Sequence, residues 1–176
     1  MGAVKDKQIG GLCPVLKRFL YDLLYKGASV FFNLFNVLLF GNLPPFGSVS
    51  VVIEDKGRFL LVKQGKSYAF PGGFMRWREH PTQTARREVY EETGLQVKIC
   101  DLIGYHSADS TGITRMSTLI LVFRGEVVGG ELRSSIEGQP VWLDEAEVQS
   151  KLVSHYTHLF EKYKAVRERT CPSKLP

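Results

Sequence analysis

Residues 73–95 read GFMRWREHPTQTARREVYEETGL, and this stretch decides the fold. Its second half predicts a helix over residues 81–93, because Pro81 suits the first helical position and Gly94 suits the position just past the end. Ala85 and Val89 lie on one side of that helix, where they can pack on a sheet. The stretch therefore predicts a loop followed by a helix with one buried side.

Three glutamates share another face of the predicted helix. Glu88, Glu91 and Glu92 are spaced i, i+3 and i+4, so their carboxylates lie together and repel one another. Mg²⁺ or Mn²⁺ would relieve that repulsion, because these ions prefer carboxylate oxygens and complete their shells with waters and substrate phosphates. The simpler alternative is a solvated acidic face with Arg86 and Arg87 as local ion-pair partners.

The full pattern favours a metal site over a solvated face. It reads Gly73, five residues, Glu79, seven residues, Arg-Glu-Val, one residue, Glu-Glu, one residue and Gly-Leu. Chance would produce this pattern with a probability on the order of 10⁻⁸ in a chain of this length. Residues 73–95 resemble the Nudix box at every defined position. The resemblance implies an α/β (α+β) fold, the Nudix-type α/β/α sandwich with a mixed sheet. It also implies hydrolysis of a nucleoside diphosphate linked to another group.

The resemblance also implies roles for individual residues. The metal ligands would be carboxylates of the box and one backbone carbonyl: Glu79, Glu88, Glu91, Glu92 and Gly72. Glu91 and Glu92 would act in catalysis together with Arg87, which would hold the loop and the glutamates by charge-assisted hydrogen bonds. Bound Mg²⁺ would neutralise the diphosphate and lower the pKa of a water that attacks phosphorus.

Many Nudix enzymes use one more glutamate outside the box. Glu137, five residues before Trp142, is the candidate here, with Glu126 and Glu131 as rivals. An exposed loop glutamate without a catalytic role explains Glu137 equally well.

The loop after Gly73 departs from the usual box, since Arg76, Trp77 and Arg78 precede the first glutamate. Two arginines and an indole ring suit phosphate contact and base stacking. The alternative, which we favour from sequence alone, is that Trp77 packs on the box helix between solvated arginines.

Other substrate cues are weaker. Residues 110–113 lack the proline or tyrosine found in subfamilies that act on ADP-ribose or dinucleoside polyphosphates. Arg115 is a further candidate for substrate binding, and Tyr105 and His106 are expected on or beside pocket strands. His155 and His158 are expected to be structural, because the last helix offers no third metal ligand.

The rest of the chain supports a single Nudix domain. Strands are expected at 48–53, 58–63, 95–103, 115–124 and 140–143, and a loop is expected at 71–73. Asp144 with Glu147 predicts a capped helix start, and a last helix is expected at 154–168. We expect an N-terminal helical extension at 1–45, the hydrolase domain at 46–170 and a tail at 171–176. Gly27 predicts a break between two helices, 14–26 and 28–40.

The extension is unusually apolar, with Ser29, Asn33 and Asn36 as a narrow polar stripe. Burial is the commoner fate of such a surface, so we expect the helical pair to pack on its own domain or across a homodimer interface. Residues 1–46 carry five Lys or Arg against two Asp or Glu, which leaves membrane association conceivable but less favoured.

Composition sets the outer limits. The 176 residues are 44% hydrophobic and 23% charged with a net charge of +5, which is typical of one globular domain. Three widely spaced cysteines argue for a reducing compartment, and we expect a cytoplasmic protein. A small nucleotide-derived substrate is expected, and no DNA-binding module is recognised. The alternatives are an RNA 5′-pyrophosphohydrolase and a non-catalytic nucleotide-sensing Nudix domain.

Overall fold

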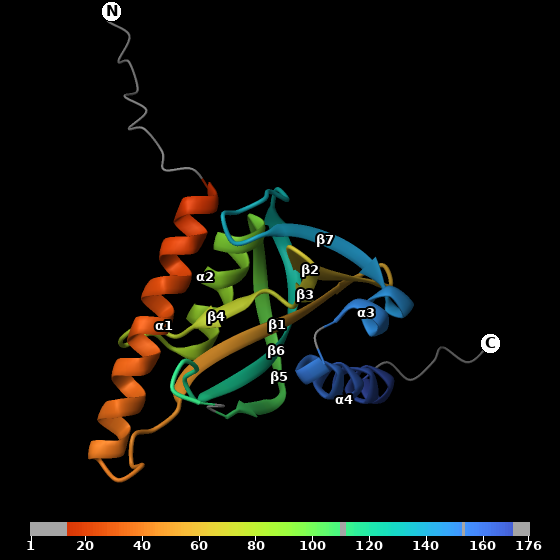
Figure 1. The fold of residues 1–176 in the computed structure, drawn as a ribbon. Helices are drawn as coiled ribbons and strands as arrows, with labels where there is room; N and C mark the ends of the chain where they lie inside the picture. The colour runs from red at the N-terminus through yellow and green to blue at the C-terminus, as the bar shows by residue number, and fades with distance from the viewer. Residues whose placement is uncertain (1–13, 110–111, 153, 171–176) are drawn as a thin grey trace, which may run out of the picture.

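The computed structural model describes residues 14–109, 112–152 and 154–170. Helices cover both faces of a twisted sheet, and a long N-terminal helix stands at one side of the domain (Figure 1). The elements in chain order are α1 (Pro14–Leu38), β1 (Phe46–Asp55), β2 (Arg58–Gln64), β3 (Ser67–Ala69), β4 (Gly72–Phe74), α2 (Pro81–Thr93), β5 (Leu95–Ala108), β6 (Thr118–Gly130), β7 (Gln139–Asp144), α3 (Glu145–Lys151) and α4 (Ser154–Thr170).

Strand β1 is the centre of the sheet. The strand order is β3-β2-β1-β6-β5, with β4 paired to β1 and β7 paired to β2. β1 runs parallel to β6 and antiparallel to β2 and β4, so the sheet is mixed, as expected. The strands expected at 48–53 and 58–63 are present as β1 and β2, and they form a hairpin with Asp55 opposite Arg58 at its turn.

The two faces of the sheet bury separate apolar clusters. Ala85 and Val89 of α2 are fully buried against one face, together with Val51 of β1. Leu159 and Phe160 of α4 are fully buried against the other face. Alternating side chains of β1 enter the two clusters in turn, which is why a strand rich in valine and isoleucine lies at the centre. The predicted α/β/α sandwich is confirmed.

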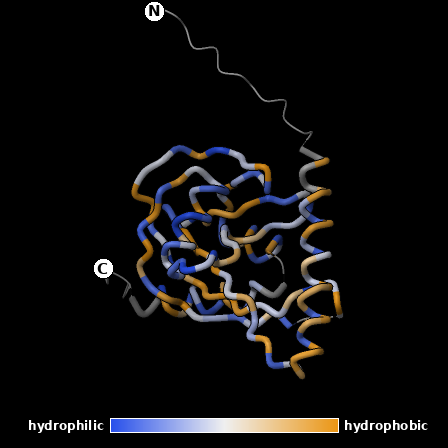
Figure 2. Tube along the Cα trace, turned by 90° about the vertical axis from the view of Figure 1, so that its left-hand side faces the viewer, coloured by the Kyte–Doolittle hydropathy of each residue, from blue (hydrophilic) through white to orange (hydrophobic). Residues whose placement is uncertain are grey.

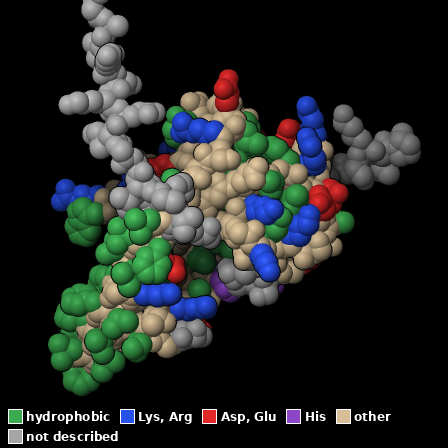
Figure 3. All heavy atoms as spheres, turned by 45° about the horizontal axis from the view of Figure 1, so that its top comes forward, with side chains coloured by type: hydrophobic (Ala, Val, Ile, Leu, Met, Phe, Trp, Pro, Cys, Tyr) green, Lys and Arg blue, Asp and Glu red, His purple; other side chains and the backbone are tan. Residues whose placement is uncertain are grey.

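The N-terminal segment is one helix and not two, so the predicted break at Gly27 is wrong. Glycine within a helix costs about 1 kcal/mol relative to alanine but does not by itself end it. The real end lies at Leu38, where Gly41 with φ 79° follows and donates its N–H to the carbonyl of Asn36 at 2.8 Å. Figure 2 shows hydrophobic residues along most of this helix, and Figure 3 shows them gathered on its outer flank.

Local signals placed the other elements with differing accuracy. The helix at 81–93 is confirmed, as is the capped start at Asp144, whose carboxylate accepts the N–H of Glu147 at 2.8 Å. The expected loop at 71–73 is wrong in part, because residues 72–74 form β4 against β1. β5 and β6 extend well beyond 95–103 and 115–124. None of the described helices has both the length and the apolar content that a membrane crossing requires.

Candidate active site

Both ends of α2 are fixed by hydrogen bonds, so its glutamates are held at defined positions. His80 caps the N-terminus by accepting the N–H of Thr82, while the Gln83 side chain accepts the N–H of His80. Gly94 ends the helix in the left-handed conformation (φ 78°) and donates its N–H to the carbonyl of Tyr90. These caps use residues of the motif itself, and the box is therefore a self-contained loop and helix.

Arg87 is hydrogen-bonded to three carboxylates of the site and to the loop before α2. Its Nε and Nη2 donate to the two carboxylate oxygens of Glu79, each at 2.8 Å. Nη1 donates to Glu88 at 2.5 Å and to Glu91 at 3.2 Å, and Nη2 also reaches the carbonyl of Phe74 at 3.1 Å. One side chain thus joins the β4–α2 loop to three carboxylates. This is the positioning role that the family resemblance implied for it.

Glu79 is held as an anion by the loop. The Arg87 guanidinium lowers the pKa of Glu79 from 4.5 to about 2, and the Arg76 N–H and the Thr84 hydroxyl also donate to its carboxylate. The side chain of Arg76 points elsewhere and donates to Glu91 at 3.0 Å. Glu91 is accordingly held between two arginines at the exposed edge of the site.

Glu92 is the buried carboxylate, with 3% of its surface exposed. It accepts the N–H of Gly72 at 2.9 Å. Burial raises the pKa of Glu92, and the neighbouring carboxylates Glu137 and Glu88 raise it further. Burial also raises the pKa of Glu88, although Arg87 opposes the shift. Several carboxylates therefore lie close together where solvent is partly excluded, which is an arrangement that a divalent cation stabilises.

Close packing requires glycine at position 72 and brings the backbone of Gly73, the first glycine of the box, against the Glu88 carboxylate. A Cβ atom on Gly73 would lie 2.6 Å from the carboxyl carbon of Glu88. One on Gly72 would lie 2.1 Å from the carbonyl oxygen of Val49. Both glycines let the backbone of β4 approach the glutamates and β1 more closely than any side chain would allow.

The carboxylate set has the chemistry of a Mg²⁺ site but not yet its geometry. Among the described residues, no three His, Cys, Asp or Glu side chains converge as a metal site requires. The cause is visible: Arg87 engages Glu88 and Glu91, while Glu92 turns to Gly72.

The structure separates the three candidates for the extra glutamate. Glu137 lies close enough to Glu92 to raise its pKa, and it also acts on Glu88. Glu126 instead pairs with Arg124 on β6 at 2.8 Å. The backbone of Glu131 packs near Gly94 at the far end of α2. Only Glu137 of these three is brought to the carboxylate cluster by the described fold.

Tyr21 is a neighbour of the site that the sequence did not reveal. It belongs to α1, and its pKa is raised by burial and by the charges of Glu137, Glu88 and Glu92. No local motif marks this tyrosine, because it reaches the carboxylates only through the docking of α1 beside α2 and β4 (Figure 1).

The loop tryptophan does not pack on the helix. Trp77 is 89% exposed, so the interpretation of Trp77 as a core residue is wrong. Arg78 has a left-handed backbone (φ 63°), and its guanidinium lies 5.9 Å from the Trp77 ring centre. The Trp77 ring and the Arg78 guanidinium lie on the loop surface, whereas the Arg76 guanidinium donates a hydrogen bond to Glu91 of the site.

Two cavities adjoin these elements. One of about 280 Å³ includes Glu92 and Gly72 in its wall, opposite Phe70 and Tyr156. The other, of about 480 Å³, lies against α1. Arg115 and His106 line the second cavity, while Tyr105 is 66% exposed. His158 is exposed on α4, and the His155 side chain lies outside the described residues.

Comparisons with known proteins agree with the geometry. The model of the NUDIX domain matches residues 44–163. A MutT-like protein from Streptomyces ambofaciens is 35% identical over 119 residues, 64% of this chain and 74% of that protein. An ADP-ribose pyrophosphatase from Methanocaldococcus jannaschii is 29% identical over 126 residues, 69% of this chain and 74% of that protein. A solved NUDIX hydrolase from Nitrosomonas europaea has a TM-score of 0.63 at 26% identity, covering 70% of this chain and 90% of that one. The chain belongs to the Nudix hydrolase family.

Proposed function

We propose that this enzyme is a divalent-metal-dependent pyrophosphohydrolase that cleaves the diphosphate bond of a nucleoside diphosphate linked to another group. The observation that carries the proposal is the crowding of Glu88, Glu92 and Glu137 around a partly buried point, beside the arginine-held Glu91. Such crowding is costly in the bare chain and is relieved by a cation and its bound phosphates.

Mg²⁺, or Mn²⁺ in its place, would be held by Glu88, Glu91 and Glu92, and when bound would neutralise diphosphate charge and acidify water. Arg87 keeps these carboxylates on one side by its bonds to the loop. Arg76 sits at the exposed edge, where its guanidinium can exchange Glu91 for a phosphate oxygen. Glu137 is the carboxylate that we assign to accept the proton of the attacking water.

The proposed substrate class rests on the cavity beside Glu92 and on the relatives. A volume of about 280 Å³ lies just below the range of roughly 300–1,000 Å³ for ligand pockets, which favours a small nucleotide derivative. One relative is named an ADP-ribose pyrophosphatase and another a MutT-like protein, and both names fit this class. A triphosphate end of RNA is the competing substrate. A sensor without catalysis is disfavoured because every carboxylate of the box is present.

A product assay tests the proposal directly. The purified chain is incubated with Mg²⁺ and a panel of nucleoside diphosphate derivatives, nucleoside triphosphates and 5′-triphosphate RNA, and products are identified by mass. Glu91→Gln, Glu92→Gln and Glu137→Gln should each lower turnover by at least ~10²-fold, since each removes a charge but little volume. Glu126→Gln is the matched control and should retain activity.

Hydrolysis in water enriched in ¹⁸O identifies which phosphorus is attacked. Activity within threefold of wild type for both Glu91→Gln and Glu92→Gln would refute the site. Exclusive action on RNA ends would keep the site and overturn the proposed substrate class.

A further inference from the structure

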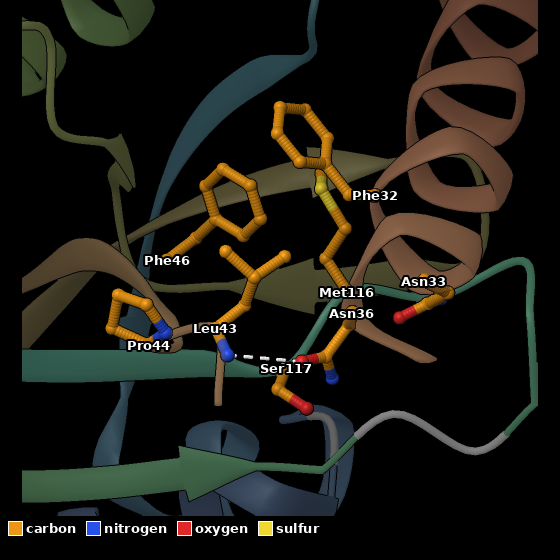
Figure 4. Close-up of a pocket in the computed structure, with 8 residues that line it drawn as sticks. All are labelled: Phe32, Asn33, Asn36, Leu43, Pro44, Phe46, Met116 and Ser117. Carbon is orange, nitrogen blue, oxygen red and sulfur yellow. Dashed lines mark hydrogen bonds between the residues drawn. The ribbon is translucent and has the colours of Figure 1, made fainter. Parts of the chain in front are cut away.

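Helix α1 contacts the domain through a narrow face that carries both polar and aromatic side chains. Asn33 donates its side-chain amide to the carbonyls of Ile113 and Arg115, each at 2.9 Å. Asn36 accepts the N–H of Leu43 at 2.9 Å, as Figure 4 shows, and Ser29 is fully buried. Aromatic side chains share this inner face, since Phe32 packs edge-on against Phe46 with 4.9 Å between ring centres. The inner face is thus narrow and of mixed polarity, which leaves most of the apolar side chains of α1 on the outside.

The outward side of α1 is apolar along its length. Eight large side chains there are each 42–72% exposed: Leu16, Leu20, Leu23, Leu24, Phe31, Leu34, Phe35 and Leu38. They follow the axis for about 33 Å. Among the described side chains of this helix, the charged ones are Asp22 and Lys26, which pair with each other at 3.4 Å on the inner margin. A row of this kind exceeds the apolar patches found on most monomers.

The width of this surface argues against a single partner helix. At 3.6 residues per turn, exposed apolar residues extend around the helix from Phe19 to Tyr21, an arc of about 200°. A helix-pair seam needs about half of that arc and normally has charged residues on its flanks. Here the flanks are Tyr21, Leu23, Ala28, Val30, Phe35 and Val37. The headgroup and acyl region of a membrane can cover such an arc, whereas a single partner helix cannot.

The apolar surface continues past the end of the helix. Phe40 is 93% exposed on the turn after α1, and Leu39 beside it is 38% exposed. Ile113, in the loop that Asn33 holds against the helix, adds a further side chain that is 58% exposed. Sequence charge favours the same partner, because residues 1–46 carry five Lys or Arg against two Asp or Glu. A net positive segment that is also strongly apolar suits anionic headgroups.

We propose that the outward face of α1, with the Leu39–Phe40 turn, lies in the headgroup region of an anionic lipid membrane, and that the enzyme is a peripheral membrane protein. The helix lies in the membrane surface and does not cross it. Because α1 stands beside α2 and β4 (Figure 1), docking places the box helix close to the lipid surface.

Vesicle flotation of the full chain tests this docking. We expect wild type to float with vesicles of phosphatidylcholine and phosphatidylglycerol, to float less with phosphatidylcholine alone, and to be released in part by salt. Leu34→Asp combined with Leu38→Asp should weaken partitioning by at least about 30-fold. Leu102→Asp on β5, where a leucine is 56% exposed, is the matched control and should float like wild type.

The controls separate lipid from protein partners and from misfolding. Both variants should keep the wild-type melting temperature and their hydrolysis of soluble substrate, because the replaced leucines are exposed. Absence of wild-type flotation, or equal flotation of the double variant, would overturn the proposal. So would sedimentation that shows a lipid-free dimer which the double variant dissociates, because the face would then be an interface between two copies.

Discussion

Replacing Glu79 by glutamine measures how firmly the box loop is tied to α2. Glu79 receives both 2.8 Å bonds from Arg87, and each of the two side chains is 15% exposed. This partner lowers the pKa of Glu79 from 4.5 to about 2. An acid with a lowered pKa stabilises the fold above its unfolded pKa, and that stability is lost as the pH falls toward the folded value.

The size of the effect follows from the shift. A change in pKa from 4.5 to about 2 corresponds to at most about 3.4 kcal/mol at neutral pH. Solvent screening of a pair near the surface reduces this to about 2 kcal/mol. More than half of this stabilisation should be lost by pH 3, so the wild type loses about 1 kcal/mol between pH 7 and pH 3. Glu79→Gln lacks the titrating carboxylate and should not show this loss.

Urea unfolding of the metal-free protein at pH 7, 5 and 3 provides the measurement. Glu79→Gln should be about 2 kcal/mol less stable than wild type at pH 7, and the gap should narrow to about half at pH 3. Glu161→Gln, which removes an exposed carboxylate from α4, is the control and should follow wild type at every pH. A gap below about 0.5 kcal/mol at pH 7, or one independent of pH, would refute the reasoning.

Three further substitutions probe the site. Burial raises the pKa of Glu92, so the metal-free wild type loses stability as the pH rises above 4.5. Glu92→Gln should abolish that loss in thermal unfolding with chelator at pH 6–9, while turnover falls. Trp77→Ala should change stability by less than about 0.5 kcal/mol in urea, because the ring is exposed, and should raise KM in steady-state kinetics. Gly73→Ala places a Cβ against Glu88 and should weaken Mg²⁺ activation by about 10-fold in a metal titration.

Each of these three has a contrary outcome. Parallel pH profiles for wild type and Glu92→Gln would mean that the buried carboxyl stays ionised. Destabilisation of Trp77→Ala by about 3 kcal/mol would restore the tryptophan to the core. Unchanged metal activation in Gly73→Ala would show that the Glu88 carboxylate moves aside freely.

Local signals in the sequence were sufficient for the box. Pro81 and Gly94 bound α2 because a missing N–H and a left-handed backbone are requirements of single positions. A local signal at Gly27 gave the wrong prediction of a helix break. A mid-helix glycine lowers helix propensity but does not end a helix whose inner face contacts the domain. The full lengths of β5 and β6 depend on their mutual pairing across a loop, and no residue within either strand marks where the pairing stops.

Contacts distant in sequence decided the rest of the site. The spacing of Glu88, Glu91 and Glu92 placed them on one face, but only the path of the loop before β7 brings Glu137 beside Glu92. The exposure of Trp77 follows from the course of a loop whose side chains point outward, which composition does not predict. Arg87 illustrates the opposite case, because motif and geometry give it the same role.

The hydrogen bonds of Asn33 join segments about 80 residues apart in the chain, so they can form only after both segments have been synthesised. During synthesis α1 leaves the ribosome before the rest of the described domain, and the loop that receives Asn33 and the parallel partner of β1 come much later. Until those later segments are made, the inner face of the helix, with Asn33 and Phe32, has no partner either, so all sides of α1 are then exposed. A nascent chain in that state is exposed to chaperones and to any nearby hydrophobic surface before the catalytic domain exists.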